Sequence, residues 1–173
     1  EENKPETIKH REETLVCFIR DVTNNKKLEQ ELQEQKAALD TTSIVAMTDA
    51  KGIINYVNDK FCQISQYARE ELIGQDHRLL NSGFHPKSMW VEMYKTVVDG
   101  EPWHQQVCNR AKDGTLYWVD TTIVAYRDEQ GKIDRYVGIR TDITKQKELE
   151  QQLIESRNSL EQRVEEQTKE LRL

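Results

Sequence analysis

The sequence predicts an α+β domain, built as a five-stranded antiparallel sheet with helices on one face. Three observations predict this class. Between about residues 43 and 144, short runs rich in β-branched and aromatic residues are separated by Gly-containing turns. The helical pattern falls in the middle of this region, so that two strands precede the helices and three follow. Polar segments with leucine spacing flank both ends.

The first half of the region predicts a hairpin and then helices. The runs SIVAMTD and GIINYVN are the first two strands, and residues 50–52 are the turn between them. Asn58 can cap a short helix over the following residues. Pro86 suits the first turn of a longer helix that ends at Gly100. Five apolar residues of this longer helix are expected on one face: Trp90, Met93, Tyr94, Val97 and Val98.

The second half predicts strands only. The runs WHQQVCNRA, TLYWVDTTIVAY and IDRYVGIRTD are separated by the turns KDG and DEQGK. Turns this short connect antiparallel neighbours. These three runs therefore complete the five-stranded sheet.

A short repeat marks the domain boundaries. DVTNNKKLEQEL begins at Asp21 and DITKQKELEQQL at Asp142, and seven of the twelve positions are identical. Each copy follows a β-rich run, and Asp-x-Thr suits a strand-to-helix junction because its side chains accept bonds from the first free helical N–H groups. The repeat predicts that the same kind of domain end occurs twice in the chain. Residues 1–23 would be the end of an upstream domain, and residues 24–42 a linker helix. Residues 43–144 would form a complete domain, and residues 145–173 an exit helix.

The flanking helices predict a homodimer. Their apolar residues follow the spacing of a coiled-coil seam, and in the exit helix the frame shifts by four residues at Leu160, a stutter that locally unwinds a coiled coil. A solvated single helix held by Glu–Lys pairs is the alternative. The seam positions are Leu28, Leu32 and Leu39 in the first helix and Leu149, Leu153, Leu160, Val164 and Leu171 in the second.

Composition excludes several classes of function. The chain has 173 residues and a net charge of −6, which argues against binding nucleic acid or an anionic membrane. It has no apolar run near 18 residues, so no membrane insertion is expected. Cys17, Cys62 and Cys108 are odd in number and widely spaced, which favours reduced thiols over a disulfide frame or a metal site. We therefore expect a cytoplasmic protein, here as a piece of a longer chain because no initiator Met is present.

The order of elements, together with KDGTLYWV, YVGIRTDIT and the exit helix, resembles the PAS family of sensory domains. The resemblance covers residues 43–153. It implies that the first repeat is the exit of a preceding PAS domain. It also implies a sensor joined by signalling helices to an effector such as a histidine kinase or a diguanylate cyclase. No catalysis is expected from this chain itself.

Within that family the sequence is more similar to the FAD-binding PAS domains of bacterial aerotaxis receptors and nitrogen-fixation redox regulators. That group has G-x-P-W followed by N-R-x-K-(D/N)-G-x-x-Y-W-V, and this chain has DGEPW and NRAKDGTLYWV. The resemblance implies non-covalent FAD, with Trp103 and Asn109 lining the flavin. Trp103 can pack on a flat ring, and Asn109 offers both a donor and an acceptor. Core packing for Trp103 and a turn role for Asn109 are the alternatives.

Light-oxygen-voltage domains give a second comparison. Their reactive Cys lies in G-x-N-C-R-F-L, and the matching stretch GQDHRLL has His77 instead, so no light-driven adduct is expected. His77 either lies over the flavin and titrates near physiological pH, or is a polar residue of a helical turn. Arg140 aligns with a flavin-contacting Gln and either stabilises an anionic reduced flavin or pairs with a surface acid. Val119 replaces a second ring-binding Asn, and Trp90 completes the expected cofactor-binding set.

Two other functions stay open. A haem sensor would use His77, His85 or His104 as axial ligand, although the long helix contains no histidine. A cofactor-free domain would act as a dimerisation and relay module. For a flavin sensor we expect Asn109 to rotate its amide on reduction. Asp142 and Thr144 would then carry the change into the exit helix and its frame shift at Leu160.

Overall fold

The computed structural model describes residues 25–170, which fall into one unit ending at Thr41 and one beginning at Thr42. The predicted upstream tail, residues 1–23, lies outside the described residues. Residues 25–42 are helical, and the leucines of the predicted seam are exposed on this helix: Leu28, Leu32 and Leu39.

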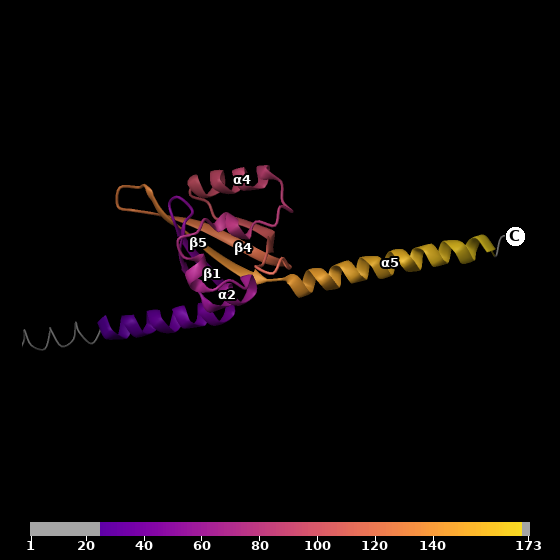
Figure 1. Ribbon diagram of the computed structural model, residues 1–173, viewed down its shortest axis with the longest axis horizontal. Helices are drawn as coiled ribbons and strands as arrows, with labels where there is room; N and C mark the ends of the chain where they lie inside the picture. The colour runs from indigo at the N-terminus through magenta and orange to yellow at the C-terminus, as the bar shows by residue number, and fades with distance from the viewer. Residues whose placement is uncertain (1–24, 171–173) are drawn as a thin grey trace, which may run out of the picture. The chain divides into compact units, whose positions relative to one another are not determined.

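The second unit contains a five-stranded antiparallel sheet in the order β2-β1-β5-β4-β3 (Figure 1). This confirms the α+β class. The chain places its last strand at the centre, between the first strand and the fourth, so that β5 joins the two hairpins into one sheet. The strands are β1 (Ile44–Asp49), β2 (Ile54–Val57), β3 (Trp103–Arg110), β4 (Leu116–Arg127) and β5 (Ile133–Asp142).

Four helical segments lie between β2 and β3, and one follows the sheet. They are α2 (Asp59–Ser65), α3 (Arg69–Leu72), the 3₁₀ turn η1 (His77–Leu80), α4 (Lys87–Val98) and α5 (Thr144–Glu170). The Asn58 side chain caps α2 as predicted, because its Oδ1 accepts a bond from Phe61 N at 3.1 Å. The same oxygen accepts a bond from Val45 N at 3.0 Å, which fixes α2 against β1. The helix α4 starts directly after Pro86, also as predicted.

The core lies between one face of the sheet and the helices. Met93 and Val97 of α4 are buried, but Tyr94 and Val98 are each 46% exposed. The predicted five-residue face of this helix is therefore too wide, because only a narrow stripe of a helix reaches a sheet. Phe61 of α2 packs on the same side, since its ring lies under the guanidinium of Arg140 on β5.

Hydrogen bonds tie the start of α5 to β4. The hydroxyl Oγ1 of Thr144 accepts a bond from Trp118 N at 3.0 Å and lies 2.6 Å from Asp142 Oδ1, to which it donates. Asp142 Oδ1 also accepts a bond from Thr144 N at 2.9 Å. The Asp-x-Thr motif thus makes the junction that its residue types predict.

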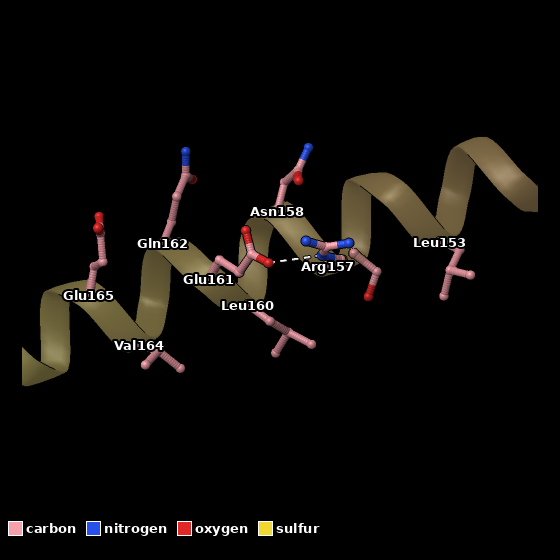
Figure 2. A pocket seen from close by; sticks show the side chains of 9 residues that line it. Leu153, Arg157, Asn158, Leu160, Glu161, Gln162, Val164 and Glu165 are labelled. Carbon is pink, nitrogen blue, oxygen red and sulfur yellow. Dashed lines mark hydrogen bonds and ion pairs between the residues drawn. The ribbon is translucent and has the colours of Figure 1, made fainter.

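Beyond this junction, α5 has an exposed apolar side. Leu153, Leu160 and Val164 project from one side of the helix in Figure 2 and are 71%, 56% and 61% exposed. No helix within residues 25–170 is long and apolar enough to cross a membrane.

Candidate ligand-binding cavity

A cavity of about 430 Å³ lies between the sheet and the helical segments. Side chains of β1, β3, β4 and β5 line one side, and side chains of α4 and η1 line the other. This volume is in the range of small-molecule sites. Five of the six residues expected to bind a cofactor line it: His77, Trp90, Trp103, Asn109 and Arg140.

Two tryptophans form an aromatic part of the wall. Trp103 at the start of β3 is 4% exposed, and its ring centroid lies 6.3 Å from that of Trp90 on α4, with an angle of 39° between the rings. The indole N–H of Trp90 is buried without a hydrogen-bond partner among the described residues. Trp103 is thus part of the core and of the cavity wall together.

Asn109 faces the cavity from β3 and is 5% exposed. It lies opposite Tyr117 in the register of β3 and β4. Burial raises the pKa of Tyr117 to about 12, so the hydroxyl keeps its proton at neutral pH. A turn role for Asn109 is wrong, because the residue lies inside the strand.

Arg140 brings a buried positive charge to the cavity. It is 5% exposed, and its Nη2 lies 2.9 Å from Nε2 of His77, while its Nη1 donates to the carbonyl oxygen of Gly138 at 3.3 Å. No carboxylate within the described residues lies at ion-pair distance, so pairing with a surface acid is wrong. Burial lowers the pKa of Arg140 to about 10, so the group stays charged at neutral pH.

His77 lies on η1 and lines the cavity, so it is both a helical-turn residue and a cavity residue. Burial, and then the charge of Arg140, lower the pKa of His77 to about 3. The expectation that this imidazole titrates near physiological pH is wrong, because a protonated imidazole would place a second cation 2.9 Å from the guanidinium of Arg140. Neutral His77 can accept a hydrogen bond from Arg140 through Nε2.

Two further residues of the sheet belong to the site in a way that sequence analysis missed. Thr121 on β4 is 2% exposed, lines the cavity and pairs with Arg140 in the register, and its hydroxyl has no partner among the described residues. Gly138 lines the cavity beside Arg140. Val119, the sixth expected residue, is fully buried and is not part of the lining.

Comparison with known proteins identifies the family. The model of the PAS domain family matches residues 41–145. The chain belongs to the PAS domain family. The nitrogen fixation regulatory protein of Klebsiella pneumoniae is 37% identical over 109 residues, which are 63% of this chain and 22% of that protein. The aerotaxis receptor of Escherichia coli is 38% identical over 112 residues, which are 65% of this chain and 22% of that protein. The chain thus spans about a fifth of the length of these relatives.

Solved structures share the fold of this PAS domain. A PAS domain from Colwellia psychrerythraea is 25% identical with a TM-score of 0.60, over 66% of this chain and 98% of that one. A structure from a flavin-analogue study of a light-oxygen-voltage domain is 23% identical with a TM-score of 0.58, over 72% of this chain and 93% of that one.

The cysteines and the other histidines of the PAS domain lie elsewhere. Neither Cys62 nor Cys108 lines the cavity, and Cys17 lies outside the described residues. Nε2 of His85 accepts a bond from Cys108 N at 2.8 Å, and His104 is exposed near Asp120. Within residues 25–170, His77 is the histidine that lines the cavity, and its Nε2 faces a guanidinium. This arrangement does not favour an axial haem ligand.

Proposed function

We propose that this PAS domain binds FAD without a covalent bond and reports redox state or oxygen. The observation that carries this proposal is the combination of an aromatic wall with buried donors, two of which, Thr121 Oγ1 and Trp90 Nε1, have no partner among the described residues. The oxidised isoalloxazine ring is flat and carries carbonyl and nitrogen acceptors along one edge. The guanidinium of Arg140, the hydroxyl of Thr121 and the indole N–H of Trp90 are suitable donors for such an edge.

The aromatic and polar residues have separate roles in this proposal. Trp103 and Trp90 would pack against the ring, since aromatic faces stack on flat heterocycles. Asn109 and Arg140 would bind its polar edge. The rim of the cavity carries Lys87, whose charge would face the FAD diphosphate. The resemblance to FAD-binding PAS domains supports the same cofactor.

The test begins with the cofactor itself. Protein expressed in a flavin-replete cytosol should be yellow and should release FAD when it is denatured. Lys87→Gln should weaken FAD binding while leaving riboflavin binding unchanged, because riboflavin has no phosphate. Lys132→Gln, in the exposed turn between β4 and β5, is the matched control. Release of FMN or haem, or a colourless protein after reconstitution with FAD, would refute the proposal.

The proposed signal path runs from Asn109 to α5. Reduction of a flavin adds a hydrogen at N5, so a neighbouring amide must exchange its donor for its acceptor, and Asn109 can do this by rotating. A mismatched buried pair costs about 1–3 kcal/mol, comparable to allosteric coupling energies. Asn109 lies opposite Tyr117 in the register of β3 and β4, and the next residue, Trp118, donates to the first residue of α5, Thr144. Two residues of β4 therefore join the cavity to the exit helix.

The proposed output is a change between two copies of α5. A parallel homodimer would cover the apolar side formed by Leu153, Leu160 and Val164, and the frame shift at Leu160 would be its bistable element. Its effector, a histidine kinase or a diguanylate cyclase, would follow in the full-length protein.

Spin labels on α5 test this output. Their spacing should change when the FAD-loaded dimer is reduced, and the change should be lost in Asn109→Ala. Removal of everything after Thr144 should weaken the dimer in sedimentation. A full spacing change in the mutant would exclude Asn109 as the switch. Equally tight association of the truncated domain would move the interface away from α5.

A further inference from the structure

We propose that Arg140 is a buried counter-charge, held in place by Gly138 and His77, for the negative charge that the flavin gains on reduction. It would thereby make the cavity bind reduced FAD more tightly than oxidised FAD. This inference rests on the proposed function, and it assigns to this chain a residue that sets the midpoint potential.

The surroundings of Arg140 stabilise its position but leave its charge uncompensated. It contacts a neutral imidazole, a backbone carbonyl and the face of the Phe61 ring, whose centroid lies 5.7 Å from the guanidinium carbon. A guanidinium has five N–H donors, and these contacts occupy two of them. A buried charge without an opposite charge is costly. An anionic partner in the cavity would remove that cost.

Gly138 creates the space in which the guanidinium lies. A Cβ built on this residue would lie 2.8 Å from both Nη1 and Nη2 of Arg140. Real Cβ atoms do not approach heavy atoms this closely, so any side chain here would move the guanidinium. The requirement concerns space, because this glycine does not have a positive φ. Gly138 therefore allows the Arg140 side chain to lie along β5, with its guanidinium at the cavity wall.

The other ionisable groups of the cavity do not neutralise Arg140. Asp76 pairs with Arg78 through Nη2 and Oδ2 at 2.6 Å. Tyr117 keeps its proton, as described above. Lys87 adds a second positive charge to the lining. The cavity therefore favours a ligand that becomes more negative, and a cation in a site of low dielectric acts strongly on such a ligand.

The experiment measures the midpoint potential of FAD-loaded protein by equilibrium titration with a reference dye. Arg140→Gln should lower the ratio of affinities for reduced and oxidised FAD at least about tenfold, which is about 30 mV for a two-electron couple. Arg140→Lys keeps a charge and should recover much of this loss. Gly138→Ala should shift the potential in the same direction by less. Arg135→Gln, an exposed arginine of the same strand, removes the same charge outside the cavity and should change nothing.

The outcomes separate this inference from the proposed function. If the wild type binds no flavin, both proposals fail. If Arg140→Gln binds FAD with the wild-type potential, or if Arg140→Lys is no better than Arg140→Gln, only the counter-charge fails. If Arg140→Gln does not fold, Gly138→Ala and Arg140→Lys decide, since a wild-type potential in Gly138→Ala despite a displaced guanidinium would overturn the inference.

Discussion

The cavity and the start of α5 each contain a cluster of polar groups on β4 and β5. The two clusters differ in whether these polar groups have hydrogen-bond partners. At the start of α5, the hydroxyl of Thr144 has a donor and an acceptor partner. In the cavity, the hydroxyl of Thr121 has none among the described residues, and Arg140 contacts only neutral groups. A polar cluster whose groups all have partners stabilises a fold by itself, whereas a buried cluster with unpartnered groups costs stability until a ligand completes it. The first cluster is therefore a structural connection, and the second is a binding site.

The largest expected effect comes from acid acting on the cavity cluster. The folded-state pKa of His77 is lowered to about 3 from an ordinary value of 6.5. Between these two pH values, His77 is protonated in the unfolded chain but neutral in the folded domain. Stability from this group therefore falls as pH falls, by about 2.5 kcal/mol between pH 7 and pH 4.5.

Urea denaturation of the ligand-free domain at several pH values measures this dependence. His77→Gln keeps an acceptor for Arg140 but does not titrate, so the difference between the two proteins isolates the histidine from the carboxylates. His104→Gln, an exposed histidine on β3, is the matched control. If the free energy of unfolding of wild type and of His77→Gln changed with pH in parallel, His77 would have the same pKa in the folded domain as in the unfolded chain, and this prediction would be wrong.

The second largest effect is expected when a hydrogen bond at the start of α5 is removed. Thr144→Val keeps the shape of the side chain but leaves Trp118 N–H without its acceptor, and we expect a loss of about 2 kcal/mol in the free energy of unfolding. Thr168→Val, an exposed threonine of the same helix that bonds only the carbonyl of Val164, should change stability by less than about 0.5 kcal/mol. Equal losses in the two variants would mean that the connection between α5 and β4 contributes nothing beyond helix propensity.

The sequence predicted the parts of this domain that follow from local periodicity and turn chemistry. Strand alternation put Trp103 and Asn109 on one face, and both line the cavity. The cap at Asn58 and the Asp142–Thr144 junction also follow from residue type, because each bonds groups within a few residues.

The missed features depend on pairings between distant residues. The role of Thr121 becomes visible only when the register places it beside Arg140, and the need for Gly138 depends on how one side chain folds back along β5. The protonation state of His77 required its burial and its charged neighbour. Val119 was assigned by alignment position, and alternation alone could not distinguish a residue of the core from one of the lining.

The smallest expected effect on stability belongs to Thr121, and it tests the comparison most directly. Because its hydroxyl has no partner, Thr121→Val should change the unfolding free energy of the ligand-free domain by less than about 0.5 kcal/mol, or should raise it. Thr122→Val, on the opposite face of β4, is the matched control. The same variant should bind FAD several-fold more weakly in a fluorescence titration, since one hydrogen bond to the ligand contributes about 0.5–1.5 kcal/mol. A large loss of stability without ligand would mean that the hydroxyl is already satisfied in the free protein, and the cavity would then resemble the α5 junction instead of contrasting with it.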